Sequence, residues 1–329
     1  MANFVIFAPD VDYFRLMMLD VLKLSNVQYI SNIPRDMGLS PLKRELYKLH
    51  NNLYLNHFFS LPFKDIWYKK MYSVDKYPDT PKCFIFFMDY LKPWNERFFR
   101  YLNSIYPNSK LVIYFEDIVA SRNTKHGNAL ALALIDKYFN LAVTFDKGDA
   151  LKYGFDYYPT FMSKIELKNE LIPAYDFLFV GADKGRLEIL GKMYKVLSSK
   201  GYRCKFSVSQ VANDKKEKGV EILKNNISYR DYLSLVGQSK CIVELVQNNA
   251  TGYTLRTWES LLYQKKIITN NKPIKETEYF NTDQFFCFDT ITDLDDIDCF
   301  MQEKIRLRTF DISPFRFLEY IEQKLHLEL

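Results

Sequence analysis

Residues 241–271 of the chain read CIVELVQNNATGYTLRTWESLLYQKKIITNN. A short apolar run ends in a polar loop, an amphipathic stretch begins near Thr254, and a second apolar run follows at once. Short apolar runs that flank a stretch with helical spacing predict two buried strands joined by a helix. This segment therefore predicts the strand–helix–strand unit of a parallel sheet with helices on its faces.

The same alternation runs through the rest of the chain. Further strands are predicted at residues 3–8, 83–89, 110–117, 141–146, 176–182, 204–208 and 285–289, and helices at 13–24, 94–105, 128–139, 186–201, 229–239, 294–306 and 314–327. Gly201 is expected to end the helix that precedes it, as glycine often does. We therefore predict an α/β fold of two doubly wound, Rossmann-like halves.

A polar stretch at residues 163–174 is the natural linker between the halves. It predicts an N-terminal domain over residues 1–168 and a C-terminal domain over 169–329, whose last helix could pack back on the first domain. Ligands of doubly wound sheets bind at the carboxyl ends of the strands, so we expect the site in a cleft between the halves.

Composition narrows the class of protein. The chain has 329 residues, of which 48% are hydrophobic and 26% charged, which is typical of a globular protein and too long for one core. The net charge of +5 permits a phosphorylated ligand, and no nucleic-acid motif is present. Five cysteines without a CxxC pair predict buried free thiols in a reducing compartment and no structural zinc. No run of about 18 apolar residues occurs, so we expect a cytosolic protein.

The loop before the helix near Thr254 has the features of a phosphate site. Unpaired N–H groups at a helix N-terminus bind phosphate, Gly252 would allow close backbone approach, and Arg256 adds a charge in the first turn. Glu259 follows within reach of a sugar hydroxyl on the same ligand. The alternative is an ordinary strand–loop–helix turn with Thr254 as N-cap.

A second basic turn, GADKGR at residues 181–186, follows the strand predicted at 176–182. Gly181, Lys184 and Arg186 at the start of a helix suit a pyrophosphate. The alternative is that Asp183 caps a helix whose exposed face is basic. The turn is neither GxGxxG nor a Walker loop, so nicotinamide and ATP sites are not indicated.

With these two motifs the chain resembles the GT-B glycosyltransferases, above all bacterial capsule and lipopolysaccharide sugar transferases. The resemblance implies that Glu259 binds the nucleotide ribose, that Gly252, Tyr253 and Thr254 wrap the diphosphate, and that the 181–186 turn faces the donor phosphates. Many retaining members carry a second Glu eight residues before the ribose Glu. That position is Thr251 here, so the usual retaining layout is not implied.

Acidic residues follow the first predicted strand, in FAPDVDYFR. GT-B enzymes often place acceptor-binding or catalytic residues on this loop, so the resemblance makes Asp12 or Asp10 the base that takes the acceptor proton. The alternative is helix N-capping. Asp89, Glu116 and Asp117 are weaker candidates at the ends of other strands.

No metal site is predicted. Asp-x-Asp occurs at residues 10–12, 293–295 and 296–298, but the last two open a helix and are expected to cap it. The four histidines show no ligand spacing, although His126 could face the cleft. No GxSxG occurs, which disfavours an α/β-hydrolase.

The segment FKDIWYKKMY, residues 63–72, mixes aromatic and basic residues. Such mixtures suit an anionic membrane interface and a lipid-linked acceptor, but they also make ordinary amphipathic helices.

These observations lead to one functional expectation with two alternatives. We expect a metal-independent glycosyltransferase that moves a sugar from a nucleotide diphosphate sugar to a glycan or lipid-linked acceptor in surface polysaccharide synthesis. It would need no cofactor, bind no nucleic acid, and lie in the cytoplasm or on the inner membrane face. The alternatives are a nucleotide-sugar epimerase or other sugar-modifying enzyme, and a non-catalytic glycan- or nucleotide-binding partner.

Overall fold

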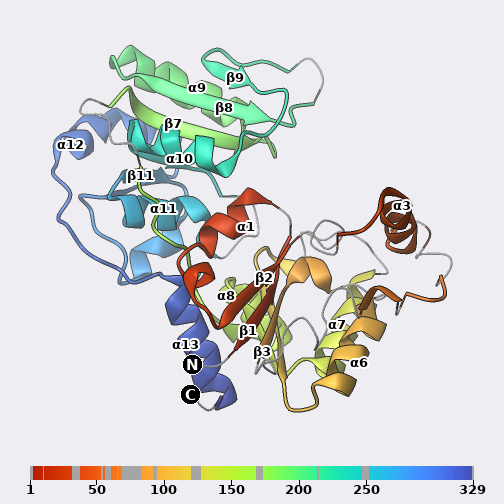
Figure 1. Ribbon diagram of the computed structural model, residues 1–329. Coiled ribbons are helices and arrows are strands. Elements are labelled where there is room, and N and C mark those ends of the chain that lie inside the picture. Colours follow the sequence, from red (N-terminus) through yellow and green to blue (C-terminus); the bar gives the residue numbers. More distant parts are fainter. Residues whose placement is uncertain are drawn as a thin grey trace. The chain divides into compact units, whose positions relative to one another are not determined.

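The structure is a computed structural model, and Figure 1 shows it coloured along the chain. It describes residues 3–9, 11–31, 38–52, 55, 61–64, 66–68, 83–91, 95–119, 127–167, 173–212, 215–246 and 252–327, with 127–131 by backbone alone. The chain divides into two compact units, the first formed by Met1–Pro159 with Pro314–Leu329 and the second by Thr160–Ser313.

The first unit is built on a sheet of six parallel strands in the order β2-β1-β3-β4-β5-β6. The strands are β1 (Phe4–Phe7), β2 (Val27–Ile30), β3 (Cys83–Phe87), β4 (Lys110–Phe115), β5 (Leu141–Thr144) and β6 (Asp156–Tyr157). The helices are α1 (Asp12–Met17), α3 (Pro41–His50), α6 (Glu96–Ile105), α7 (Gly127–Tyr138), α8 (Lys147–Tyr153) and α13 (Pro314–Leu325), with short 3₁₀ turns η1 (Val21–Lys23) and η2 (Met88–Tyr90).

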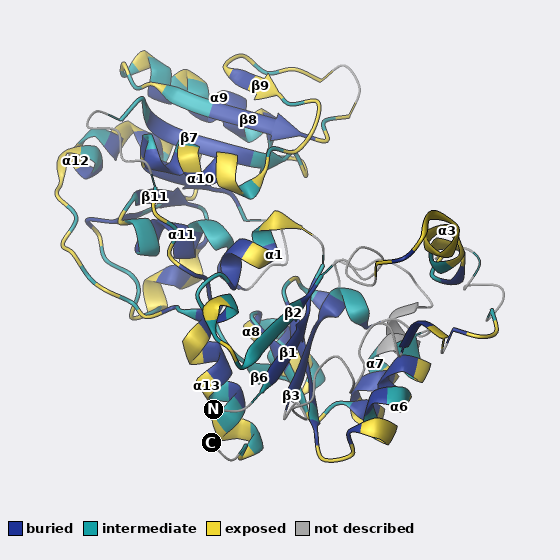
Figure 2. Cartoon of the chain, viewed as in Figure 1, coloured by how far each residue is buried: buried dark blue, intermediate teal, exposed yellow. Residues whose placement is uncertain are grey.

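Side chains of β3 alternate between two helical layers. Phe86 packs edge-on against Phe99 of α6, with ring centroids 5.2 Å apart. Its neighbour Phe87 points to the other face, where it meets Phe14 of α1 at 5.1 Å. On that face Phe317 of α13 also packs against a strand of the sheet. Because each face is covered, all five residues of β3 are buried, as Figure 2 shows for the strands in dark blue.

The second unit repeats this design with the strand order β12-β11-β10-β7-β8-β9, again all parallel. Its strands are β7 (Tyr175–Ala182), β8 (Cys204–Ser209), β9 (Val220–Ile222), β10 (Ser239–Glu244), β11 (Lys266–Thr269) and β12 (Phe285–Cys287). Its helices are α9 (Leu187–Ser199), α10 (Tyr229–Gly237), α11 (Leu255–Tyr263) and α12 (Ile297–Gln302), with 3₁₀ turns η5 (Lys272–Glu276) and η6 (Ile291–Asp296).

Here too the central strand has two buried faces. Phe177 and Phe179 of β7 belong to a core formed with α9 and α12, whereas Leu178 and Val180 belong to a core formed with α10. The expectation of an α/β protein with two doubly wound halves is therefore confirmed. Gly201 adopts φ +85° just after α9, and the amide of Tyr202 donates to the Leu197 carbonyl, so the expected glycine C-cap is confirmed as well.

The division between the units falls at Pro159, earlier than the polar stretch that begins at Ser163. Phe161 is fully buried, and the amide of Met162 donates to the carbonyl of Ile312 at 2.8 Å, within the second unit. The amide of Ile165 donates to the Tyr263 hydroxyl. The change to polar composition therefore comes after the chain has already joined the second unit.

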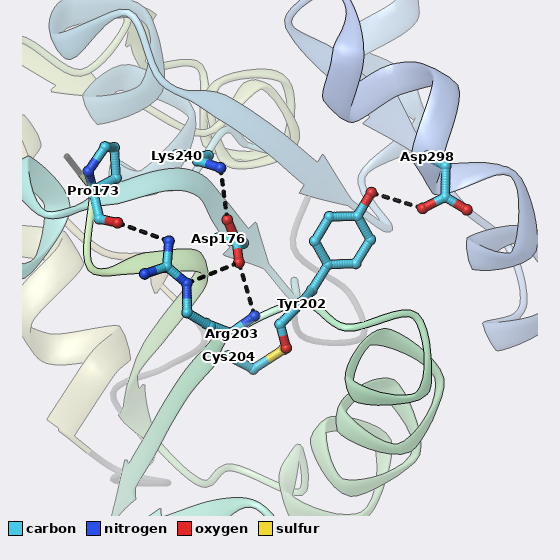
Figure 3. Close-up of polar contacts among 7 residues, drawn as sticks. All are labelled: Pro173, Asp176, Tyr202, Arg203, Cys204, Lys240 and Asp298. Atoms are coloured by element: carbon cyan, nitrogen blue, oxygen red, sulfur yellow. Dashed lines mark hydrogen bonds and ion pairs between the residues drawn. The ribbon is translucent and has the colours of Figure 1, made fainter.

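A buried carboxylate fixes the start of β7 (Figure 3). Asp176 accepts hydrogen bonds from the amide of Arg203 at 2.8 Å and forms an ion pair with Lys240 at 2.8 Å. Arg203 in turn donates to the carbonyl of Pro173. Burial opposes ionisation of Asp176, but these donors outweigh it and leave its pKa below the usual range. Ion pairs of Asp176 with Arg203 and Lys240 thus stabilise the start of β7.

Several short elements differ from the predicted ones. The strands β2, β6 and β9 and the helix α8 were not predicted, because each is short and the three strands lie at sheet edges. Helix α3 was not predicted either, although its ten residues carry a helical leucine spacing. The helix expected over residues 13–24 ends as α1 at Met17 and continues as a turn and η1.

Candidate functional site

Two arginines from separate motifs converge at the carboxyl-terminal edge of β7. Arg186 follows the strand in the 181–186 turn, and Arg256 lies in the first turn of α11. Both approach Gly181: a Cβ at that position would lie 2.7 Å from Arg256 Nη2 and 3.8 Å from Arg186 Nη1. Glycine at 181 therefore leaves the space that the Arg256 guanidinium occupies.

The guanidinium groups are held by the backbone and one aromatic ring. Arg256 Nη2 donates to the Val180 carbonyl, and its guanidinium carbon lies 4.8 Å from the centroid of the Phe179 ring. Arg186 Nη1 donates to the Ala182 carbonyl at 3.4 Å and lies over the same ring at 5.8 Å. These contacts orient both cations at one strand end.

The two cations are incompletely neutralised. Among the described residues, the Nε atoms of Arg186 and Arg256 are buried and have no hydrogen-bond partner. Burial, and then the positive charge of Arg256, lower the pKa of Arg186 to about 10. A pair of like charges held together with spare donors favours binding of an anion with several oxygens, such as a phosphate or diphosphate.

The 181–186 turn supplies both the cap and the cation. Asp183 Oδ1 accepts from the amide of Leu187, the first residue of α9, at 2.8 Å, although the N-cap residue of this helix is Arg186 and not Asp183. Lys184 and Gly185 take left-handed φ values of 44° and 81°, and the Lys184 side chain is exposed. Arg186 is the basic residue of this turn that reaches the strand end beside Gly181.

The loop that leads into α11 ends in a capped helix start. Thr254 is the N-cap, and its Oγ1 accepts from the amide of Arg256 at 3.2 Å, as the N-cap alternative predicts. The Gly252 carbonyl accepts from Asn271 Nδ2 at 3.4 Å. Tyr253 is 5% exposed and packs edge-on against Trp258, so its side chain belongs to the core and only its backbone can serve the loop. Thr251 lies outside the described residues.

Glu259 lies inside the second unit and is 1% exposed. Its carboxylate accepts from the hydroxyl of Tyr229 at 2.8 Å and from that of Tyr232 at 2.6 Å, both on α10. Burial raises the pKa of Glu259, against the opposing effect of the two tyrosines and of the Arg256 charge. The residue thus has a clear structural role in joining α11 to α10, and its contact with a ribose stays a prediction.

Glu244 is a second buried carboxylate of this unit, and no motif in the sequence singles it out. Glu244, the last residue of β10, is 1% exposed and accepts hydroxyl hydrogen bonds from three threonines. Its partners are Thr254 at 2.5 Å, Thr257 at 2.7 Å and Thr269 at 2.5 Å. The signal available in the sequence was an acidic residue that ends the apolar run 241–244 and is followed by several threonines.

In the first unit the candidate base is exposed. Asp12 is the first residue of α1, whose N-cap is Val11 without a side-chain cap, so Asp12 is not the N-cap residue. Asp10 lies outside the described residues. Glu116 accepts from the amide of Met88, and Asp117 from the amide of Ile118, so these two acids support local backbone.

The aromatic–basic segment 63–72 is described only in part. Trp67 and Tyr68 are buried, and Trp67 Nε1 donates to His50 Nδ1 at 2.7 Å. Lys64 is buried too. These three side chains therefore pack inside the first unit, and contact of the segment with a membrane stays a prediction. Lys69, Lys70, Tyr72 and His126 lie outside the described residues.

The cysteines, acidic residues and helices bear on further expectations from the sequence. All five cysteines are free; Cys83 and Cys241 are buried as expected, whereas Cys299 is exposed on α12. The described ranges contain no group of three or more His, Cys, Asp or Glu that could hold a metal ion. Asp293 forms a capping box with Thr290, as expected. No helix in the described part of the chain is both long enough and apolar enough to cross a membrane.

Comparison with known proteins gave structural likeness alone. No protein-family model matches the chain, and no curated protein sequence does. The chain is similar to UDP-GlcNAc 2-epimerase of Methanocaldococcus jannaschii, in complex with UDP-GlcNAc and UDP (13% identity, TM-score 0.49, 97% of this chain and 99% of that chain). It is also similar to UDP-N-acetylglucosamine 2-epimerase of Rickettsia bellii (10%, 0.47, 100% of both chains). A UDP-forming α,α-trehalose-phosphate synthase of Burkholderia vietnamiensis matches as well (8%, 0.44, 82% and 83%). At these values the chain is assigned to none of their families.

Proposed function

We propose that the protein is a glycosyltransferase that takes a sugar from a nucleotide diphosphate sugar. The observation that carries the proposal is the convergence of Arg186 and Arg256 on Gly181, with their Nε atoms buried and unpaired in the described part of the chain. The resemblance of the 181–186 and 252–259 segments to the donor-binding region of GT-B enzymes supports the same assignment.

The proposed chemistry uses few protein groups. The bond between the anomeric carbon and the diphosphate oxygen breaks, and the acceptor hydroxyl oxygen forms the new bond to that carbon. Arg186, Arg256 and the start of α11 stabilise the negative charge that develops on the leaving diphosphate, while Gly181, Lys184 and the backbone of Gly252 and Tyr253 line the phosphate site. Asp12 or Asp10 of the first unit takes the acceptor proton, and no metal takes part.

The proposed acceptor is a glycan or a lipid-linked glycan of surface polysaccharide synthesis. Helix α3 supports a contact with an anionic membrane. Leu42, Leu46 and Leu49 are 81%, 40% and 49% exposed and recur at helical spacing, which makes an apolar ridge on this helix. Lys43, Arg44 and Lys48 are exposed on the same helix and match the charge of anionic lipid.

This contact is tested with the single variant Leu42→Gln in sedimentation with phosphatidylglycerol vesicles. We expect the bound fraction to fall several-fold, since one buried leucine contributes roughly 1.5–3 kcal/mol. Leu151→Gln is the matched control, because Leu151 is a 90% exposed leucine of the same unit, on α8. Equal binding by both variants and the native protein would show that α3 does not contact the membrane.

The experiment that tests the function has two stages. Thermal shift against UDP-, GDP- and dTDP-sugars, with a CMP-sugar as the monophosphate comparison, should find one diphosphate donor that raises Tm in proportion to RT ln(1 + [L]/Kd). Incubation of that donor with candidate acceptors, followed by mass spectrometry, should give free nucleoside diphosphate and a product larger by one sugar.

Other results would support the alternatives. A donor converted to an isomer of unchanged mass indicates an epimerase. A donor that binds but stays intact with every acceptor indicates a non-catalytic binding protein. Failure of every nucleotide sugar to raise Tm would contradict the proposal.

A further inference from the structure

Three threonine hydroxyls donate to Glu244, and within the described ranges no Lys or Arg forms an ion pair with it. Thr254 and Thr257 donate to Oε1, and Thr269 donates to Oε2. Thr257 and Thr269 are fully buried, so the group forms a dry cluster at the carboxyl end of β10. An ionised carboxylate is only an acceptor, so it can accept hydrogen bonds from three hydroxyl groups at the same time.

Two of these threonines, Thr254 and Thr269, also accept a hydrogen bond from a backbone amide. Because the Thr254 proton is directed to Glu244, its Oγ1 lone pair faces the amide of Arg256. In the same way Thr269 donates to Glu244 and its Oγ1 accepts from the amide of Asn271 at 2.9 Å. Hydrogen bonds in such chains polarise and strengthen one another.

Both series of hydrogen bonds lead to residues 252–254, the described residues directly before α11, which we call the pre-α11 loop. Thr254 is the last residue before α11, and Asn271 Nδ2 donates to the carbonyl of Gly252. Glu244 therefore reaches two residues of the pre-α11 loop, Thr254 directly and Gly252 through Thr269 and Asn271.

We propose that Glu244 is a positioning residue, which clamps the pre-α11 loop at Thr254 and Gly252 and so places Arg256 against the edge of β7. The part of this proposal that concerns the diphosphate rests on the proposed function; the clamp itself does not. Arg256 comes two residues after the N-cap, so a displaced cap moves the guanidinium away from Val180 and Gly181.

Glutamine cannot replace Glu244 in this role. Its amide nitrogen is a donor, so at least one threonine would have to turn its proton away from residue 244. That change in hydroxyl orientation weakens the hydrogen bond that Thr254 or Thr269 accepts from the backbone. The variant Glu244→Gln keeps the size of the side chain and removes the acceptor pattern, which makes it the direct test.

The first readout is amide hydrogen exchange of the ligand-free protein, followed by NMR. In Glu244→Gln at least one of the amides of Arg256 and Asn271 should exchange about 2- to 10-fold faster, the equivalent of one weakened hydrogen bond. Glu221→Gln is the matched control, because Glu221 accepts from Lys205 and Ser207 on the same sheet. Unchanged exchange at both amides in Glu244→Gln would overturn the proposal.

Should Glu244→Gln fail to fold, Thr269→Val removes one arm of the clamp and leaves Glu244 in place. Faster exchange at Asn271, with less change at Arg256, is expected from two separate arms. Unchanged exchange at Asn271 in that variant would overturn the proposal.

The second readout is calorimetric titration with inorganic pyrophosphate. Glu244→Gln should weaken binding about 5- to 30-fold in the native background and less than about 2-fold in Arg256→Ala, because the two act through one group. Equal losses in both backgrounds would overturn the claim that Glu244 acts through Arg256. If the native protein binds no pyrophosphate, the phosphate site of the proposed function fails, and the exchange result still decides the clamp.

Discussion

Arg256→Ala should weaken binding of a nucleoside diphosphate by about 10- to 150-fold. Arg256 is one of two guanidinium groups at Gly181, and its Nε has no partner in the described part of the chain. A hydrogen bond to a charged group contributes about 1.5–3 kcal/mol, which gives that range when converted at about 1.4 kcal/mol per tenfold change in Kd. Calorimetric titration with the best nucleoside diphosphate measures it.

The same substitution also has a structural cost. It removes the hydrogen bond to the Val180 carbonyl and the contact with the Phe179 ring, and it relieves the repulsion between Arg256 and Arg186. We expect a net loss of roughly 1 kcal/mol in the free energy of unfolding, measured by urea denaturation. A loss of this size leaves the fold intact at room temperature, so the binding measurement stays meaningful.

Arg308→Ala is the matched control. Arg308 also donates to backbone carbonyls, those of Glu278 and Tyr279, and also lies over an aromatic ring, that of Phe310 at 5.1 Å. It should lose comparable stability and bind the nucleotide normally. If Arg256→Ala binds normally, or if both variants lose affinity equally, the diphosphate does not sit on Arg256.

Four substitutions and one metal-removal experiment give further tests. Burial raises the pKa of Glu259, so the folded state holds its proton more tightly than the unfolded chain and is weakened as pH rises; the stability cost of Glu259→Gln should therefore be smaller at pH 7 than at pH 5 in urea titrations. The opposite trend is expected of Asp176→Asn, because hydrogen bonds hold the pKa of Asp176 below its usual range: its cost should be full at pH 7 and decline as the pH falls toward 3. Gly181→Ala should reduce nucleotide affinity with little change in Tm, because the new Cβ would lie 2.7 Å from Arg256 Nη2; normal affinity would show that the guanidinium can move at no cost. Asp12→Asn should slow transfer by about 10²- to 10⁴-fold with intact nucleotide binding, and normal turnover would show that Asp12 is not the base. Transfer by the native protein should persist in EDTA, and a loss of activity that manganese restores would show that a metal takes part.

The central strands and the basic motifs were predictable because their signals are local. Runs such as FVIF and CFIFF are apolar on both faces, as buried parallel strands require. Arg186 and Arg256 were singled out by their place after a strand and at a helix start. That they meet at Gly181 follows from β7 and β10 being neighbours in the sheet, which puts the turns that follow them at one edge.

The contacts that the sequence did not show depend on packing between segments that are apart in the chain. Tyr253 was expected in the loop that wraps a diphosphate, and the sequence did not show that its ring packs against Trp258, five residues later. Trp67 has an interfacial composition around it, but His50, seventeen residues away, provides its hydrogen-bond acceptor. Glu244 was missed because a glutamate at the end of an apolar run carries no mark of the three threonines that meet it in space.

The return of α13 to the first unit has a consequence for synthesis on the ribosome. Phe317 packs on Tyr114 and Tyr158, and Tyr320 donates to Asp156, so the first sheet lacks part of one face until residues 314–325 emerge. Translation at about 5–20 residues per second puts roughly 10 to 30 s between the synthesis of Pro159 and that of Pro314. The second unit, continuous from Thr160 to Ser313, is complete before the first, so the order of maturation is the reverse of the order of translation. A nascent chain stalled before residue 314 should expose the aromatic face of β4 to chaperones, and a circular permutant that begins at Pro314 should not.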